Sequence, residues 1–233
     1  IPMLLVSYAN VSRRIPMSLL LMPRELFAMG NTTRGQTMSL PKLRFSEFLD
    51  AGEWENSTLI EIAKFRRGSF PQPYGLPEWY DEENGIPFVQ VFDVNDDLRL
   101  KTKTKNKISK LGAEQSVFIP KGTLIVTLQG SIGRVAITQY DAYVDRTLLL
   151  FESFYKSIEK LFFAYVIQNL FEIEKHKAPG GIIKTITKEV LSSFKVGLPN
   201  FLEQQKIADC LSSISDRITL SLIHISEPTR LRR

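Results

Sequence analysis

The run Gly180-Gly-Ile-Ile-Lys-Thr-Ile-Thr187, followed by Leu198-Pro-Asn-Phe-Leu-Glu-Gln-Gln-Lys-Ile-Ala208, indicates most about how this chain is organised. A glycine turn leads into a short β-branched stretch, and a proline-marked loop then opens a helix. The apolar residues of that helix follow spacings of four, three and four: Ile207, Leu211, Ile214 and Ile218. These spacings place one narrow stripe on one helix face, which is the pattern of a coiled-coil seam.

Upstream of this segment, the chain reads as short strands and one main helix. Strands are predicted over residues 86–94, 117–119, 123–128, 135–138 and 146–151. Residues 158–175 are apolar almost all round and predict a buried helix. Residues 70–87 hold four prolines among aromatic and acidic residues, which is typical of a long ordered loop. Mixed strands with one or two helices indicate an α+β domain.

Four stretches of this sequence resemble the specificity subunit of type I restriction-modification systems, and they occur in the same order as in that family. They are Met38-Ser-Leu-Pro-Lys-Leu-Arg-Phe-Ser-Glu-Phe-Leu-Asp-Ala-Gly-Glu-Trp54, Ile86-Pro-Phe-Val-Gln-Val-Phe-Asp-Val94, Gly122-Thr-Leu-Ile-Val-Thr-Leu-Gln-Gly-Ser-Ile-Gly133 and the segment quoted first. The resemblance implies a target recognition domain over residues 38–199, with a mixed, twisted β-sheet and packed helices. It further implies that residues 200–219 begin a long coiled-coil spacer helix, truncated here.

The resemblance also implies a function. A chain of this family selects a sequence in double-stranded DNA and directs methyltransferase and nuclease/translocase subunits to it, without being an enzyme itself. S-adenosylmethionine, ATP and Mg²⁺ would then belong to the partners, and no cofactor is expected in this chain. Family members typically carry two recognition domains, so one domain here fits a truncated subunit or a half-subunit that forms a homodimer. Ile207, Leu211, Ile214 and Ile218 would pack against a second helix and the methyltransferase.

Composition sets weaker bounds. The chain of 233 residues has a formal net charge of +5, but residues 1–37 and 220–233 carry all of the excess. Global charge therefore says nothing about DNA, and only local clusters can. The single cysteine, Cys210, excludes a disulfide within the chain and fits a cytoplasmic location. No apolar run reaches the roughly 18 residues expected of a membrane span.

Both ends are interpreted as separate from the domain. Residues 1–37 precede the family-like Met38 and show no sustained period, so we expect a non-native or disordered extension; a natural arm is the alternative. The run Leu220-Ser-Leu-Ile-His-Ile-Ser-Glu-Pro-Thr-Arg230 looks like the in-frame translation of a sequencing-library adapter. Residues 220–233 are therefore interpreted as an artefactual tail that interrupts the heptad pattern where the helix should continue, and Pro228 would break the helix; a natural tail is the alternative.

Two basic stretches are candidates for phosphate contact. Arg66, Arg67 and Ser69 flank a glycine, where a backbone can approach a phosphate closely. Lysines alternate at Lys101, Lys103, Lys105 and Lys107, so an extended strand would project all of them from one face. The alternatives are a solvated loop for the first stretch and a charged edge strand that prevents aggregation for the second.

Two glycine loops are the other DNA-binding candidates. In Gln129-Gly-Ser-Ile-Gly-Arg134, glutamine can pair with adenine and arginine with guanine, and Ser131 lies between them. In the second loop, basic and hydroxyl groups surround two glycines: Lys177, Gly180, Gly181, Lys184 and Thr185. That composition suits phosphate contact. Either loop could instead be a plain turn.

Other functions have less support. Residues 70–80 could form the aromatic site of a carbohydrate- or protein-binding module. Tyr74, Trp79 and Tyr80 could stack on a displaced base, although packing in the core or loop is the simpler interpretation. Asp93, Asp96 and Asp97 could hold the metal of a nuclease, with a solvated turn as the alternative. One cysteine and two isolated histidines support no zinc site.

Overall fold

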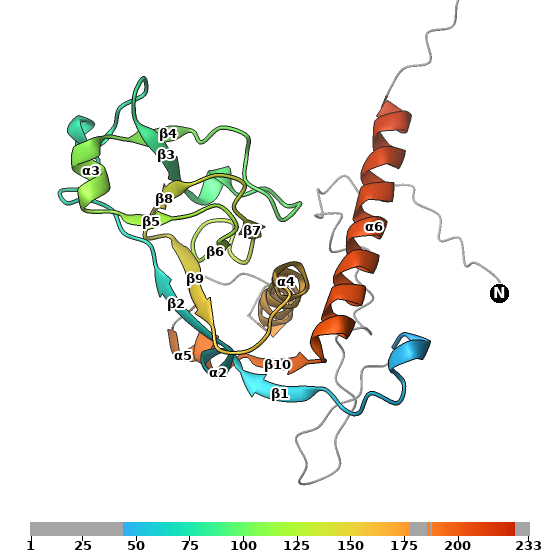
Figure 1. Cartoon of the computed structure of the whole chain (residues 1–233). Helices are drawn as coiled ribbons and strands as arrows, with labels where there is room; N and C mark the ends of the chain where they lie inside the picture. The colour runs from blue at the N-terminus through green and yellow to red at the C-terminus, as the bar shows by residue number, and fades with distance from the viewer. Residues whose placement is uncertain (1–43, 178–185, 187, 227–233) are drawn as a thin grey trace, which may run out of the picture.

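The computed structural model of this chain describes residues 44–177, 186 and 188–226 (Figure 1). The strands are β1 (Glu55–Thr58), β2 (Ala63–Arg67), β3 (Ile86–Val89), β4 (Asn106–Ile108), β5 (Val117–Ile119), β6 (Leu124–Thr127), β7 (Val135–Ile137), β8 (Ala142–Val144), β9 (Leu148–Phe154) and β10 (Lys195–Leu198). The α-helices are α2 (Leu59–Ile62), α3 (Lys110–Glu114), α4 (Lys160–Lys177), α5 (Lys188–Ser192) and α6 (Phe201–Ser226), and the 3₁₀ turns are η1 (Ser46–Phe48), η2 (Pro77–Trp79) and η3 (Val91–Asp93).

The strands form two four-stranded sheets and one two-stranded sheet. The first large sheet has the order β2-β9-β6-β7 and the second has the order β4-β3-β8-β5, while β1 pairs with β10. All described pairs are antiparallel except β3 with β8, which is parallel. The predicted α+β class with mixed sheets is therefore confirmed.

A helix covers one face of the first sheet, and the second sheet covers the other. Helix α4 packs its buried Phe162, Phe163 and Phe171 with Leu124 and Val126 of β6 in one apolar cluster. Ile125 of β6 lies instead in a second cluster, with residues of β3, β5 and β8. Strand β6 is therefore buried on both faces, which explains why its sequence, Leu-Ile-Val-Thr, does not alternate. The predicted buried helix over residues 158–175 is confirmed as α4.

Several predicted strands have different bounds. Residues 86–94 divide into β3 and the 3₁₀ turn η3, and the strand predicted from Arg146 begins at Leu148. Of the alternating lysines, Lys107 lies in β4, but Lys101, Lys103 and Lys105 precede it in an irregular segment, so the strand prediction was wrong for these three. The strands predicted over residues 117–119 and 123–128 follow one another in sequence, but as β5 and β6 they belong to different sheets.

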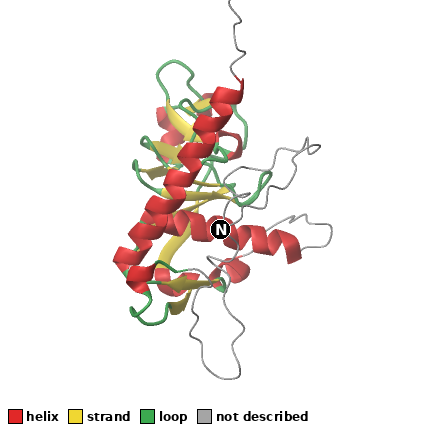
Figure 2. Cartoon of the chain, turned by 90° about the vertical axis from the view of Figure 1, so that its right-hand side faces the viewer, coloured by secondary structure: helices red, strands yellow, loops and turns green. Residues whose placement is uncertain are grey.

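Helix α6 is the longest described element and runs lengthwise over the molecule, while α4 lies across it (Figure 2). The side chain of Asn200 caps the first turn of α6 by accepting a hydrogen bond of 2.9 Å from the Glu203 N–H. The helix continues past residue 219 to Ser226, and the proposed origin of the tail stays a hypothesis. Residues 1–37, the rest of the proposed tail and Pro228 lie outside the described residues.

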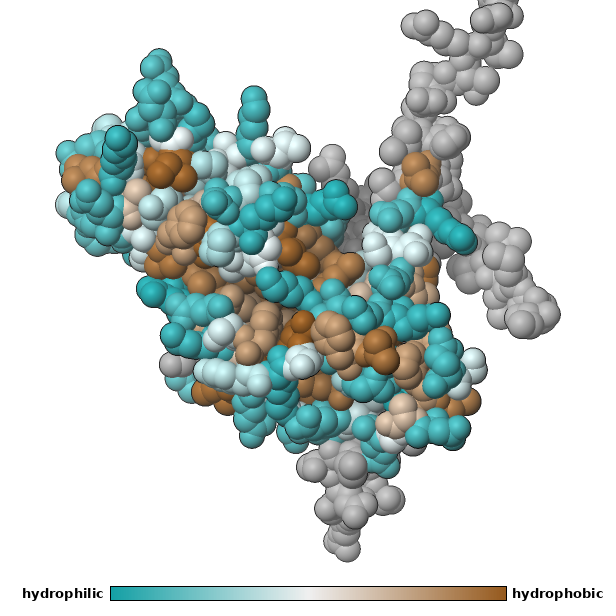
Figure 3. Space-filling model, viewed as in Figure 1, coloured by the Kyte–Doolittle hydropathy of each residue, from teal (hydrophilic) through white to brown (hydrophobic). Residues whose placement is uncertain are grey.

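In the described part of the chain, none of the helices combines the length and the apolar character that crossing a membrane requires. The face drawn in Figure 3 carries brown hydrophobic areas that hydrophilic side chains separate. Phe201 and Leu202, at the start of α6, are among the exposed large apolar residues.

Candidate nucleic-acid interface

Three loops meet at one edge of the β2-β9-β6-β7 sheet, where β2 and β6 end and β9 begins. Backbone hydrogen bonds join them: Gly68 N–H donates to Leu148 O at 3.0 Å, Ser69 N–H to Val144 O at 3.0 Å, and Leu128 N–H to Thr147 O at 2.8 Å. We call residues 68–70, 129–133 and 145–147 the loop edge. The structure thus brings together two of the separately predicted stretches, around Ser69 and around Gln129.

The β6–β7 loop has a tightly held backbone. The Thr127 hydroxyl donates to Ser131 O, the Arg134 N–H donates to the Thr127 hydroxyl at 3.0 Å, and the Gly133 N–H donates to Thr127 O at 2.9 Å. Gln129 and Ser131 themselves are exposed. Both predicted side chains are therefore presented to solvent by a rigid turn.

Helix α4 supports this loop at Gly133. That residue has a φ of +83°, and a Cβ placed there would lie 2.6 Å from the Cβ of Phe171. A glycine is needed at this position because any side chain would be strained and would also collide with α4. The loop is thereby fixed on the main apolar cluster.

Arg134 is already engaged within the chain. Its Nε lies 2.6 Å from Oδ1 of Asp96, and its Nη1 donates to Val94 O at 3.2 Å. Its side chain is 36% exposed. Reading of a base by Arg134 stays a prediction, and it would require this ion pair to open.

The arginines at the end of β2 lie in different surroundings. Arg66 is an exposed residue 3.8 Å from the carboxylate of Glu152, and Arg67 donates from Nη2 to Ile186 O at 3.4 Å. Because side chains alternate along a strand, the two project from opposite faces. Ser69 donates from its hydroxyl to Gln115 O at 3.0 Å. Of these three, Ser69 lies within the loop edge and Arg67 ends the strand leading to it.

The predicted lysine ridge is replaced by an irregular loop. Lys101, Lys103 and Lys105 are exposed, but the Lys101 and Lys105 N–H groups donate to Asp93 rather than to a neighbouring strand. The Lys105 ammonium lies 5.0 Å from the centre of the Phe92 ring. Phosphate contact by these lysines stays a prediction. Because they lie in an irregular loop, they do not share the single face that a strand would have given them.

Asp93 organises this region as a buried acceptor. It is fully buried, with Oδ2 accepting from the Gln90 N–H at 2.9 Å and Oδ1 accepting from the Lys105 N–H at 2.9 Å. Burial raises the pKa of its carboxyl group, and the two hydrogen bonds act in the opposite direction. Asp96 pairs with Arg134, and no acidic, histidine or cysteine side chains of the described residues cluster as metal ligands do. Asp93 and Asp96 are thus already engaged within the chain, and their arrangement gives the alternative of a nuclease metal site no support.

Replacing Asp93 with asparagine is expected to lower the free energy of unfolding by about 1–3 kcal/mol. One oxygen becomes an NH₂ group, which would face an N–H donor of Gln90 or Lys105 inside the protein. Urea denaturation measures the difference. Asp97→Asn is the matched control, because that exposed carboxylate accepts one hydrogen bond, from Arg99 N–H at 3.2 Å. Equal stability of the two variants would contradict the prediction.

Most of the aromatic loop is packed. Trp79 is buried and donates from Nε1 to Pro73 O at 2.8 Å, while Phe70 contacts Phe88 with ring centres 5.5 Å apart. The simpler interpretation of Trp79 as a core residue is confirmed, which leaves the alternative binding module without its tryptophan. Tyr74 is exposed, and its ring lies 5.3 Å from the guanidinium of Arg146 in the loop edge. We did not predict Arg146 as a site residue.

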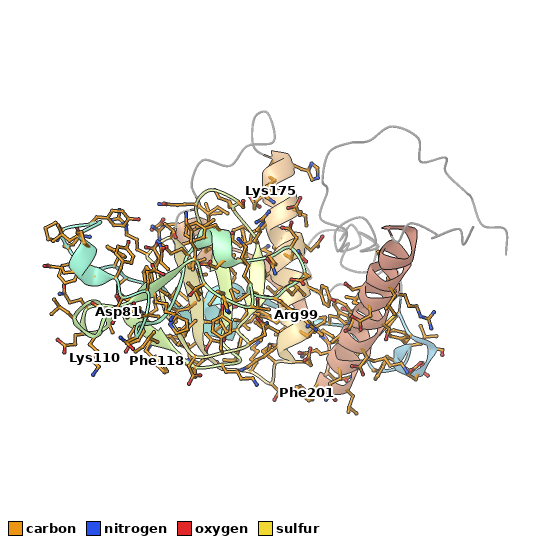
Figure 4. All side chains as sticks on the ribbon, turned by 90° about the horizontal axis from the view of Figure 1, so that it is seen from above. Asp81, Arg99, Lys110, Phe118, Lys175 and Phe201 are labelled. Atoms are coloured by element: carbon orange, nitrogen blue, oxygen red, sulfur yellow. The ribbon has the colours of Figure 1, made fainter. Side chains whose placement is uncertain are left out.

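The end of α4 carries another predicted candidate. Lys177 lies there, 2.6 Å from the carboxylate of Glu174, and Lys175 pairs with Glu172 in the same last turns. Figure 4 shows Lys175 at one end of α4, and places Asp81, Lys110 and Phe118 at the side of the molecule opposite Phe201 of α6. Gly180, Gly181, Lys184 and Thr185 lie outside the described residues, so their predicted role has no structural test.

A buried polar joint attaches α6 to the domain. Glu203 accepts hydrogen bonds from Arg44 Nε at 2.8 Å, Arg44 Nη2 at 2.7 Å and Trp54 Nε1 at 3.1 Å. Its neighbour Gln204 accepts from the Glu159 N–H at 2.9 Å and donates to Ser157 O at 3.1 Å. The pKa of Arg44 is raised, chiefly by its hydrogen bonds to Glu203. These contacts explain the polar Glu-Gln pair in the segment that opens the helix.

The apolar stripe of α6 divides into two parts. Ile207 and Leu211 are 3% and 6% exposed and belong to the same buried cluster as α4. Ile214 and Ile218 are half-buried. The prediction that all four pair with a partner helix is therefore wrong for the first two, because α4 of the same chain lies against that part of the helix.

Comparison with known proteins identifies the fold. Residues 51–227 match the family model described as type I restriction modification DNA specificity domain. The chain belongs to this family. The matched residues of this specificity domain include the whole loop edge and the whole of α6.

Individual relatives agree with the family. A protein from Methanocaldococcus jannaschii, assigned as the MjaX specificity subunit of a type I restriction enzyme, is 27% identical over 97 residues, which cover 42% of this chain and 23% of that protein. The HsdS subunit from Thermoanaerobacter tengcongensis has a similar structure, with a TM-score of 0.57 and 23% identity over 75% of this chain. The S subunit from M. genitalium gives a TM-score of 0.51 and 20% identity over 74% of this chain.

A further solved chain comes from a study of complex assembly and conformational transition of the type I R-M system. It gives a TM-score of 0.57 and 22% identity over 72% of this chain. The specificity domain spans 39%, 40% and 42% of the lengths of these three solved chains. At such identities the similarity establishes the fold, and it confirms the resemblance from which the domain was predicted.

Proposed function

We propose that this chain recognises a DNA sequence as the specificity subunit, or half-subunit, of a type I restriction-modification complex. The observation that carries the proposal is the family match over residues 51–227. In this proposal the chain performs no chemistry. It directs methyltransferase and nuclease/translocase partners to their target, and those partners supply S-adenosylmethionine, ATP and Mg²⁺. Its location would be the cytoplasm.

We infer that the loop edge is the surface that contacts the DNA duplex. Its support is the presentation of Gln129 and Ser131 on a rigid, exposed turn, beside Ser69 and the end of β2. A glutamine amide can donate from its NH₂ group to adenine N7 and accept from adenine N6–H₂, which discriminates adenine from other bases by about 1–3 kcal/mol. Arg67 and the exposed lysines at 101–105 would add contacts to phosphates.

The half-exposed end of the α6 stripe supports a second contact. Ile214 and Ile218 are the stripe residues that α4 does not bury, so they would pair with a second helix. That helix would come from a further recognition domain in a longer subunit, or from a second copy in a homodimer. Methyltransferase subunits would bind along the same helix.

Binding of the purified chain to a randomised duplex library tests the proposal. We expect selection of one short sequence, and an affinity that falls with salt because each neutralised phosphate contributes about −0.9 to the log–log slope. Gln129→Ala is expected to relax the selected sequence at one position, whereas Gln205→Ala, an exposed glutamine on α6, leaves it unchanged. Absence of any selected sequence, with or without the methyltransferase partners, would contradict the proposal.

A further inference from the structure

We propose that Arg146 reads a guanine of the recognised sequence, with Tyr74 holding its guanidinium in place; this inference rests on the proposed function. Arg146 lies in the turn Val144-Asp-Arg-Thr147 between β8 and β9, within the loop edge. Asp145, Arg146 and Thr147 separate the apolar residues Val144 and Leu148. The turn therefore places an arginine at the surface between two buried strands.

The backbone around Arg146 is held from several strands. Asp145 N–H donates to Val89 O at 3.0 Å, and Leu148 N–H donates to Asp145 O at 3.1 Å. The buried carboxylate of Asp145 accepts from the Thr147 N–H at 2.8 Å, which closes the turn. The backbone of Gly68 also packs directly against this turn. Arg146 is thus attached to a rigid platform, which favours a fixed geometry of contact over an adaptable one.

The Arg146 side chain is exposed, and an aromatic ring rather than a carboxylate lies beside its guanidinium. Its guanidinium lies 5.3 Å from the centre of the Tyr74 ring, and that ring lies 4.5 Å from the ring of Phe70, which is buried. Arg134 and Arg66 each face a carboxylate, whereas Arg146 forms no ion pair with any of the residues that the structure describes. No internal ion pair with those residues would have to break before the guanidinium meets a ligand.

This arrangement fits guanine in the major groove. An arginine fork pairs with the O6 and N7 acceptors of guanine, and stacking on an aromatic ring restricts the plane in which the fork lies. Gln129 of the adjacent loop offers the complementary adenine chemistry. The loop edge would therefore read neighbouring base pairs with side chains from two turns that a backbone hydrogen bond connects, from Leu128 N–H to Thr147 O.

The experiment begins with the sequence that the full chain selects from the randomised library. Each guanine of that sequence is replaced in turn by 7-deazaguanine, which lacks the N7 acceptor, and binding is measured for the wild type, Arg146→Ala, Arg146→Lys and Arg217→Ala. Arg217 is an exposed arginine on α6 and serves as the matched control. We expect one 7-deazaguanine position to weaken wild-type binding about 5- to 150-fold and Arg217→Ala binding equally.

For Arg146→Ala the same 7-deazaguanine should cause no further loss, and other bases should be accepted at that position. Arg146→Lys keeps the charge over Tyr74 but loses the fork, so it should share the relaxed preference. Uniform weakening across sequences, with a salt slope smaller by about one, would identify a phosphate contact and overturn the inference. Unchanged selection in both variants would also overturn it. Failure of the wild type to select any sequence would instead overturn the proposed function, and this inference with it.

Discussion

Replacing Glu203 with alanine is expected to lower the free energy of unfolding by about 3–5 kcal/mol, the cost of leaving a buried charge without its partner. The side chains of Arg44 and Glu203 are 5% and 1% exposed, so solvent cannot replace the lost carboxylate. Trp54 Nε1 would lose its acceptor at the same time. Because these three residues join the start of the domain to α6, the same change should also release the first turns of the helix.

Urea denaturation measures the loss, and hydrogen exchange in α6 tests the release. Glu47→Ala is the matched control, because Glu47 forms an exposed ion pair with Lys206 at 3.2 Å beside the same helix. We expect no measurable change in that variant. The double variant Arg44→Met/Glu203→Met should be more stable than Glu203→Ala, since it leaves no buried charge unpaired. A stable Glu203→Ala protein with a protected α6 would contradict the prediction.

The second large effect is expected at Gly68. Changing it to alanine should cost about 3 kcal/mol, at the upper end of what overpacking costs. A Cβ at Gly68 would lie 2.4 Å from the carbonyl oxygens of Val144 and Asp145. Both are backbone atoms at the turn that carries Arg146, so relief requires that turn to separate from Gly68 and its neighbours within the loop edge. The variant should therefore lose sequence-selective DNA binding even at temperatures where it remains folded.

Thermal unfolding and binding to the selected duplex are measured on the same preparations. Ser69→Ala, one residue away, adds no atom and removes the hydrogen bond from the hydroxyl to Gln115 O. We expect it to cost less than about 1 kcal/mol. A Gly68→Ala protein as stable as Ser69→Ala would mean that the close packing of β2 on the β8–β9 turn does not hold in solution.

The elements with strong periodic patterns could be predicted from sequence. The continuous apolar run of α4 predicts a buried helix, the spaced apolar residues of α6 predict a helix with one apolar stripe, and the apolar run at Leu124 predicts a strand. The Gln129 loop could be predicted because its glycines mark a turn of known chemistry. The family resemblance rested on the segment around Leu124 and Gln129 and on the start of α6, together with residues 38–54 and 86–94.

Long-range contacts account for what could not be predicted. The lysines at 101–105 alternate as a strand would, but the Lys101 and Lys105 N–H groups donate to Asp93, and none of the three lies in a described strand. Arg146 looks like the first residue of a strand, and only its hydrogen-bonded turn shows it to be a loop residue. Glu203 reads as an ordinary polar helix residue, because its partner Arg44 is far away in sequence.

The division of the α6 stripe has a geometric consequence. The first turns of the helix are anchored in the domain by Glu203, Ile207 and Leu211, so the later turns form a rigid arm whose direction is set by the domain itself. One residue inserted after Leu211 would turn everything beyond it by about 100° and move it about 1.5 Å along the axis. Any partner held on Ile214 and Ile218 would swing around the helix by the same angle. An insertion in a surface loop would leave the orientation of that partner relative to the domain unchanged.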